Sequence, residues 1–180
     1  MKHGYWLAII LVMGIAGAAW AQQPGVIRAT GFVLVDDQGR ERANWYVGSS
    51  FSGMTFKDEN GNARVMLLIF ESETLMFLSG ENNHPLSGIS LGTGKDGSAL
   101  CLHGKNGELR ITLNASEDRS ELKLYDDYNK ERVRLDADYG SPGLRFYDFN
   151  GKVRAGMDVD VPGPSLWLFD ENGKEIWGSP

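Results

Sequence analysis

Apolar residues recur along this chain with a period of 22 positions. Each copy is indexed here by a glycine or asparagine in a turn-like segment, and the indices are separated by 22 residues in five intervals and by 24 in one. A constant period of this size is typical of repeat architectures, in which each copy packs against its neighbours. The seven index residues are Gly39, Gly61, Asn83, Gly107, Asn129, Gly151 and Gly173.

Four positions of the repeat are apolar in each of the first six copies: seven and five before the index, and six and eight after it. The residues between them are mostly polar, so apolar and polar positions alternate on both sides of the index. Alternation with a period of two indicates strands with one apolar face, and it predicts two strands per copy. The position five before the index holds Leu34, Phe56, Leu78, Leu102, Leu124, Phe146 and Leu168.

The index residue follows an asparagine in five copies, which predicts a β-hairpin with a two-residue Asn-Gly loop of type I′. This loop would pair the position five before the index with the one four after it, so that apolar positions share a face. It would also place Tyr125 opposite Arg132 and Tyr147 opposite Arg154, as cross-strand cation–π pairs. We assign the two extra residues of the 24-residue interval to a longer loop over 92–98.

The predicted fold class is therefore all-β, with tandem 22-residue β-hairpin repeats over residues 31–180. Lone hairpins are marginally stable in water, so neighbouring copies must bury one another's apolar side chains. We expect an antiparallel meander of about fourteen strands that is closed or folded over its apolar face. A two-sheet β-solenoid, with one 22-residue coil per repeat, is the alternative.

The second and third copies are apolar on both faces, as in the segment Met66-Leu67-Leu68-Ile69-Phe70. Fully buried strands have this composition. Either another part of the chain covers the second surface, or a partner does. A homo-oligomer formed through Met66, Leu68, Phe70 and Phe77 is the partner alternative.

The first residues predict a secretory signal peptide over 1–21, followed by a short linker over 22–30. Lys2 precedes an apolar run, and Ala19-Trp20-Ala21 provides small residues at the two positions that signal cleavage requires. The run is shorter than the ~20 residues of a membrane-spanning helix, and an uncleaved anchor is the alternative. We expect an exported protein, which is periplasmic, on the cell surface or extracellular, without a membrane span in the mature chain.

Charge and residue chemistry exclude several classes of function. The net charge is −6 with no basic block, which argues against nucleic acid as a partner. The single cysteine, Cys101, allows no internal disulfide, and with His103 it lacks a third residue that would orient a catalytic pair. We expect no cofactor, no metal site and no catalytic residues. Calcium binding by acidic residues near the turns stays open: Asp136, Asp138, Asp158 and Asp160.

The segment FDENGKEIWG, residues 169–178, resembles the hairpin repeats of choline- and cell-wall-binding modules. It is more distantly similar to YD repeats and to the MORN hairpin repeat. The pattern L-x-L-Y-D-x-N-G-K-x-R resembles that of uncharacterised exported bacterial repeat proteins, which implies a surface or envelope module. Trp45, Trp167 and Trp177 fall at different repeat positions, so the resemblance implies no choline site.

We therefore expect a non-enzymatic exported repeat module that acts as a structural or binding surface. Aromatic residues interleaved with arginines would suit a glycan or a protein, although the same residues could simply shield the sheet. A small outer-membrane β-barrel is one alternative, although its strands would need ~9–11 residues to span a bilayer. An enzyme of unknown class is another. The candidate binding residues are Tyr125, Tyr147, Phe169, Trp167, Arg132, Arg145 and Arg154.

Overall fold

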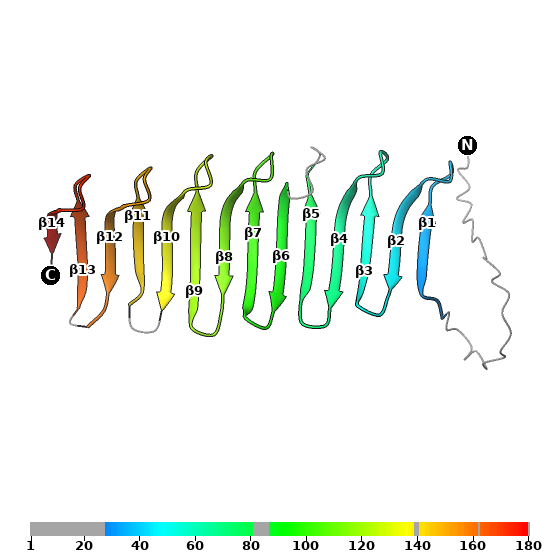
Figure 1. Ribbon diagram of the computed structural model, residues 1–180, viewed down its shortest axis with the longest axis horizontal. Helices are drawn as coiled ribbons and strands as arrows, with labels where there is room; N and C mark the ends of the chain where they lie inside the picture. Colours follow the sequence, from blue (N-terminus) through cyan, green and yellow to red (C-terminus); the bar gives the residue numbers. More distant parts are fainter. Residues whose placement is uncertain (1–27, 81–86, 139–140, 162, 180) are drawn as a thin grey trace, which may run out of the picture.

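The computed structural model describes residues 28–80, 87–138, 141–161 and 163–179. These residues form one antiparallel sheet of 14 strands, in which every strand pairs with its neighbours in sequence (Figure 1). The meander of tandem hairpins is confirmed, and the two-sheet solenoid is wrong. The strands are β1 (Gly31–Val35), β2 (Glu41–Val47), β3 (Phe51–Lys57), β4 (Ala63–Phe70), β5 (Thr74–Ser79), β6 (Gly88–Gly94), β7 (Gly97–His103), β8 (Leu109–Ala115), β9 (Arg119–Tyr125), β10 (Glu131–Asp138), β11 (Gly143–Tyr147), β12 (Val153–Val159), β13 (Pro164–Phe169) and β14 (Glu175–Ser179).

The sheet is a long ribbon with β1 and β14 at its two ends. The turns that contain the index residues lie along one long edge, and the turns between successive copies lie along the other (Figure 1). The described residues include no helix long and apolar enough to cross a membrane. The predicted signal peptide and most of the linker lie outside the described residues.

The predicted hairpin register is confirmed in the body of the strands. In the sixth copy Phe146 pairs with Ala155, and Leu144 pairs with Met157. The next interstrand ladder pairs Ala155 with Leu168, which belongs to the seventh copy. Paired residues in a ladder share a face, so the recurring apolar positions all lie on one side of the sheet, which we call the apolar face. The other side is called the mixed face.

The turn at the index residue differs from the predicted two-residue type I′ loop. The Gly151 N–H donates to Asp148 O at 3.0 Å, and the Asp148 N–H donates to Lys152 O at 2.8 Å. These bonds enclose three loop residues, and only the last, Gly151, has positive φ, at 79°. A turn of this length with a left-handed third residue is the next most common hairpin connection. The same pair of bonds recurs at Gly39, Gly61, Gly107, Asn129 and Gly173.

A β-bulge beside the turn restores the predicted register. Tyr147 pairs with Val153 and Phe146 with Ala155, so Arg154 has no partner of its own in the ladder. The predicted cross-strand pair between Tyr147 and Arg154 is therefore wrong. The pair of Tyr125 with Arg132 is wrong for the same reason, because Tyr125 pairs with Glu131.

An aspartate three positions before the index stabilises this turn. Asp148 Oδ1 accepts hydrogen bonds from Asn150 N at 2.8 Å and from Lys152 N at 3.0 Å. The Lys152 N–H, with smaller contributions from Asn150 and Arg154, lowers the pKa of Asp148. In the fourth copy Gly104 replaces the aspartate, and Glu108 accepts the hydrogen bond from Asn106 N instead. The aspartate makes the same two bonds at Asp36, Asp58, Asp126 and Asp170.

The two extra residues of the 24-residue interval are not in the loop over 92–98. Gly94 pairs with Gly97 there, which leaves a tight two-residue turn. Leu78 instead pairs with Ile89, two residues further on than the spacing of the other copies requires. The insertion therefore lies at the index turn of the third copy, between β5 and β6.

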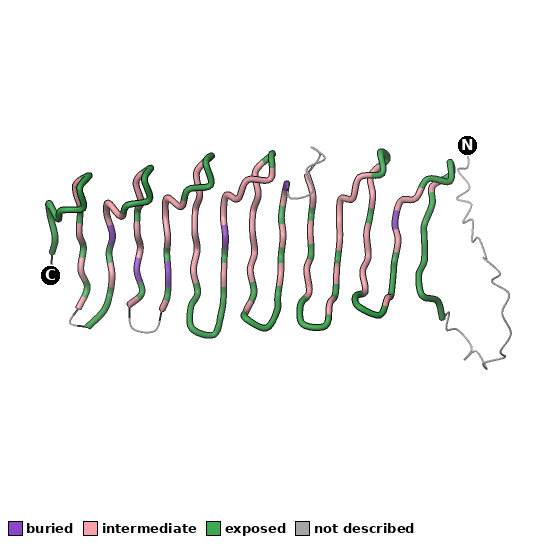
Figure 2. Tube along the Cα trace, in the orientation of Figure 1, coloured by how far each residue is buried: buried purple, intermediate pink, exposed green. Residues whose placement is uncertain are grey.

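The single layer leaves the apolar face uncovered within the chain. Among the described residues, Ala43 is the only hydrophobic side chain classed as buried. The strands consist mostly of intermediate and exposed residues, as Figure 2 shows. The sheet is open, so the expected closure over the apolar face does not occur within one chain.

The mixed face changes character along the ribbon. Over β4 and β5 it presents Met66, Leu68, Phe70 and Phe77, which are half-buried against one another and their neighbours. Over β9 to β13 it presents charged and aromatic residues. An oligomer formed through the apolar end of this face stays a prediction.

Candidate functional site

Five of the seven predicted binding residues lie on the mixed face between β9 and β13. Tyr125 ends β9, Arg145 and Tyr147 are on β11, and Trp167 and Phe169 are on β13. The other two, Arg132 and Arg154, occupy the bulges beside the index turns. The structure therefore brings the predicted residues to one end of one face.

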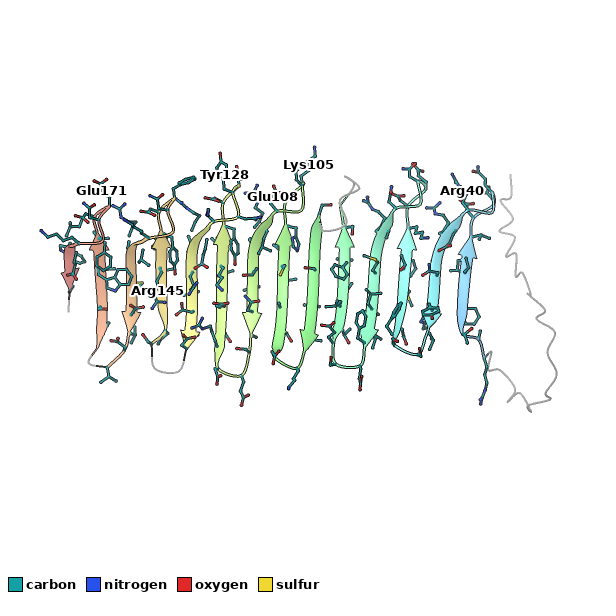
Figure 3. All side chains as sticks on the ribbon, in the orientation of Figure 1. Arg40, Lys105, Glu108, Tyr128, Arg145 and Glu171 are labelled. Atoms are coloured by element: carbon teal, nitrogen blue, oxygen red, sulfur yellow. The ribbon has the colours of Figure 1, made fainter. Side chains whose placement is uncertain are left out.

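Arg145 is the centre of the charged part of this surface. Its Nη1 lies 2.7 Å from Asp136 Oδ2 on β10, and its Nη2 lies 2.9 Å from Asp158 Oδ1 on β12. Figure 3 labels Arg145 within the sheet, away from the turn edge where Arg40, Lys105 and Glu171 are labelled. One guanidinium thus links three successive strands with charge-assisted hydrogen bonds. Asp136 is 3% exposed, so this contact with Arg145 is made almost entirely out of reach of water.

A second arginine, Arg134, lies opposite Arg145 in the ladder between β10 and β11. Its charge is balanced by Glu131, with Nε and Oε1 2.8 Å apart. The Arg134 guanidinium also lies 5.8 Å from the centre of the Tyr147 ring. Tyr147 therefore stacks with an arginine, as predicted, but with Arg134 of the preceding copy in place of Arg154. Desolvation raises the pKa of Tyr147, and this effect exceeds the opposing influence of Arg134.

The charged ladder continues onto β9. Lys123 Nζ lies 2.6 Å from Glu121 Oε1, and Arg119 makes a bond of 2.8 Å to Asp138 across the strand pair. Desolvation opposes ionisation of Glu121, but Lys123 and nearby arginines outweigh it and lower the pKa of this carboxyl. Side chains of like charge thus form rows across the strands: one row holds Lys123, Arg134 and Arg145, and the next holds Glu121 and Asp136. Contacts between the two rows balance these charges, and the side chains cover the sheet without a second layer.

The aromatic part of the surface lies beside Arg145. The Trp167 ring lies against Gly156, where an added Cβ would collide with the ring atoms. Gly156 pairs with Arg145 on one side and with Trp167 on the other. The Phe169 ring centre is 5.1 Å from that of Trp167. Because Gly156 has no side chain, the indole can lie over β12 and reach toward Arg145.

Arg132 and Arg154 have a different role from the predicted stacking on tyrosines. Arg154 Nη1 lies 3.5 Å from Asp148, and its Nε donates to Phe169 O at 3.0 Å. Arg132 Nη1 lies 3.8 Å from Asp126. Each bulge arginine therefore interacts with the aspartate that stabilises its own index turn, and Arg154 also links its copy to the next one.

The sequence interpretation missed the partners of these residues. Arg134, Glu131, Asp136 and Asp158 complete the charged network, but only the aspartates had been noted, as calcium candidates. Arg134 and Asp136 are two residues apart on β10, and this alternation was the signal that would have placed them on one face. Asp136 and Asp158 both contact Arg145, and the described residues contain no cluster of three metal-ligating side chains.

A serine–histidine contact is the other chemical feature of the mixed face. Ser90 Oγ and His103 Nε2 are 3.0 Å apart, whereas Cys101 lies beside them as the ladder partner of Ser90. The Nδ1 atom of His103 is buried without a hydrogen-bond partner. A nucleophile–base pair normally has a third group that orients the base. Ser90 and His103 therefore provide a hydroxyl group and a base, but among the described residues no third group binds the Nδ1 atom of His103 to orient the base.

The arrangement over β10 to β13 combines a flat indole, a second aromatic ring and a fixed guanidinium with its two carboxylates. It can stack against a planar or ring-shaped ligand and can also form hydrogen bonds to it. No protein-family model matches this chain, and no curated protein matches it in sequence, so what can be said of its function comes from this surface.

Proposed function

We propose that this chain is a non-enzymatic exported repeat module whose mixed face binds a saccharide at Trp167. The module would act in the cell envelope or outside the cell, as the predicted signal peptide suggests. The observation that carries the proposal is the Trp167 ring lying against Gly156, next to Arg145.

The shape of this surface suits a sugar ring. An aromatic side chain has a large apolar body, and its flat face can cover the C–H surface of a pyranose. Ligand sites generally combine such an apolar surface with a few fixed polar groups that set orientation. Arg145, Asp136 and Asp158 are held in place by their mutual bonds of 2.7 and 2.9 Å. Arg145 and Asp158 would meet the hydroxyl groups at the edge of the ring, and the buried Asp136 would hold Arg145 in place.

The repeat supports the proposal in a second way. Trp167 is on the seventh copy, six positions before the index residue. The same position holds Lys123 in the fifth copy and Arg145 in the sixth. Phe77 holds this position in the third copy but is followed two residues later by Ser79, so the aromatic pair of Trp167 with Phe169 is specific to the seventh copy. We expect one saccharide site per chain, with the preceding copies contributing polar contacts.

A glycan array probed with the purified chain tests this proposal. We expect binding that Trp167→Ala weakens by at least ~10-fold, because aromatic residues at the centre of a contact contribute about 1–2 kcal/mol or more. Tyr46→Ala is the matched control, since Tyr46 is an aromatic residue exposed on the mixed face at the opposite end of the ribbon. An array without binding, or binding that Trp167→Ala leaves unchanged, would reject the proposal.

A further inference from the structure

The apolar face carries no charged residue at any described position of the strand ladders. Its two central rows are formed by the positions five and seven before the index and by their ladder partners, which are Leu, Ile, Val, Met, Phe, Trp and Ala except at Ser179. The other polar side chains on this face lie in the row beside the turns between copies: Ser52, Thr74, Thr93, Ser98 and Ser120.

This face is also open to solvent over the whole length of the ribbon. Trp45 on β2 is 53% exposed, Leu135 on β10 is 51% exposed and Met157 on β12 is 49% exposed. Large apolar side chains on soluble monomers do not usually form a continuous exposed surface of more than a few hundred Å². Here the surface runs across 14 strands.

The size of the surface limits what can cover it. With neighbouring strands ~4.8 Å apart and ~3.4 Å per residue along them, the 14 strands span roughly 60 Å by 20 Å, about 1,200 Å². The longest stretch outside the described residues is 1–27. Even as a helix it would be about 40 Å long and 10 Å wide, which covers about a third of the face.

A second copy of the chain meets the requirement for area. Two such faces in contact bury about 2,400 Å² in total, which is within the range of obligate homodimers. Flat sheets pack face to face at a separation of ~10 Å with their apolar side chains interdigitated. A contact between identical faces is self-complementary under two-fold symmetry, so it closes at two copies.

Charge argues against a lipid surface as the occupant. At the index-turn edge that borders the face, arginines are paired with the recurring aspartates, as Arg42 is with Asp36 and Arg132 with Asp126. The edge therefore has no excess of positive charge, and the net charge of the chain is −6. Peripheral binding to anionic membranes depends on clustered lysines and arginines next to the apolar surface. A second copy, with the same uncharged centre, imposes no such requirement.

We propose that two copies of this chain pack apolar face to apolar face as a homodimeric β-sandwich. Each mixed face then lies on the outside, and the dimer presents the Trp167 surface twice. This contact differs from the sequence-based expectation of an oligomer through Met66, Leu68, Phe70 and Phe77, which lie on the mixed face. The inference is independent of saccharide binding.

Sedimentation equilibrium of the purified chain at micromolar concentrations tests the proposal directly. We expect a mass twice that of the single chain, and small-angle X-ray scattering with the cross-section of two stacked sheets. The variant with Leu113→Lys and Leu135→Lys places two charges in the central row of the apolar face and should give a monomer. The control variant, with Thr55→Lys and Ala99→Lys, adds the same charges to the mixed face and should stay dimeric.

The scattering of the unsubstituted chain keeps the proposal testable if the lysine variant does not fold. A monomeric mass, or a dimer with the thickness of one sheet, would overturn it. A folded variant with Leu113→Lys and Leu135→Lys that stays dimeric would also overturn it. A control variant with Thr55→Lys and Ala99→Lys that is monomeric would overturn it as well. Co-sedimentation of the unsubstituted chain with phosphatidylcholine or phosphatidylglycerol vesicles, in place of dimerisation, would assign the face to lipid.

Discussion

Replacing Arg145 by leucine tests whether the charged network stabilises the C-terminal half of the sheet. The change removes both contacts of Arg145, at 2.7 Å to Asp136 and 2.9 Å to Asp158. Asp136 is 3% exposed, so its carboxylate would stay buried without its cationic partner. The leucine retains apolar bulk, so the main loss is the charge interaction.

Removing one partner of a buried ion pair typically costs 3–5 kcal/mol. The Arg145 side chain is 25% exposed, and water can therefore reach part of the site. We expect a loss of about 2–3 kcal/mol in the free energy of unfolding, which corresponds to a fall of about 5–10 °C in Tm for a domain of this size.

Thermal and urea unfolding, followed by circular dichroism, measures this loss. The double variant Arg145→Leu with Asp136→Asn should recover more than half of it, because the buried site no longer holds an unpaired charge. Arg154→Leu is the matched control: its carboxylate contact is longer, at 3.5 Å, and its side chain is 36% exposed, so the loss should be smaller. An Arg145→Leu variant as stable as Arg154→Leu, or one that Asp136→Asn does not rescue, would refute the reasoning.

Further predictions concern the index turn and the aromatic surface. Gly151→Ala should reduce stability by about 1 kcal/mol in urea unfolding, because an L-residue is strained at φ 79°, whereas Gly163→Ala, at an open position without positive φ, should have little effect. The hydrogen bond from the Lys152 N–H lowers the pKa of Asp148 below its unfolded value, so its stabilisation is present above about pH 4 and is lost as pH falls through the folded pKa. Asp148→Asn should therefore flatten the dependence of the urea midpoint on pH in this range. Gly156→Ala should displace the Trp167 ring and weaken saccharide binding as Trp167→Ala does, with the circular dichroism spectrum unchanged.

The pairing of the strands could be predicted because apolar residues must share a face. With Phe146 and Ala155 both apolar in an alternating pattern, a register that separates them would expose one of them on a charged surface. The number of strands and the order of the meander follow from the same alternation, repeated at a constant period.

The turn could not be predicted from the Asn-Gly dipeptide alone. That dipeptide favours a two-residue loop, but the carboxylate of Asp148 binds two loop N–H groups and favours three residues. The bulge at Arg154 then compensates for the additional loop residue. Two irregularities that cancel leave the apolar pattern intact, and periodicity therefore carries no trace of them.

The candidate surface could be predicted in part. Alternation placed Tyr147, Arg145 and Trp167 on one face, but their contacts depend on the bulge and on the missing side chain at Gly156. The expected closure of the sheet failed for another reason. Burial of the apolar positions is required by their composition, but a pattern along one chain does not specify whether the cover is the same chain or a second copy.

The repeat fold is tested most directly by isotope-edited NMR spectra that identify the residues next to the backbone of Phe146. In the meander Phe146 is paired with Val133 and Ala155, and Leu168 is two strands away. We predict through-space contacts from the backbone of Phe146 to Val133 and Ala155 and none to the backbone of Leu168. A backbone contact between Phe146 and Leu168, which occupy the same repeat position 22 residues apart, would show stacked coils and would contradict the account.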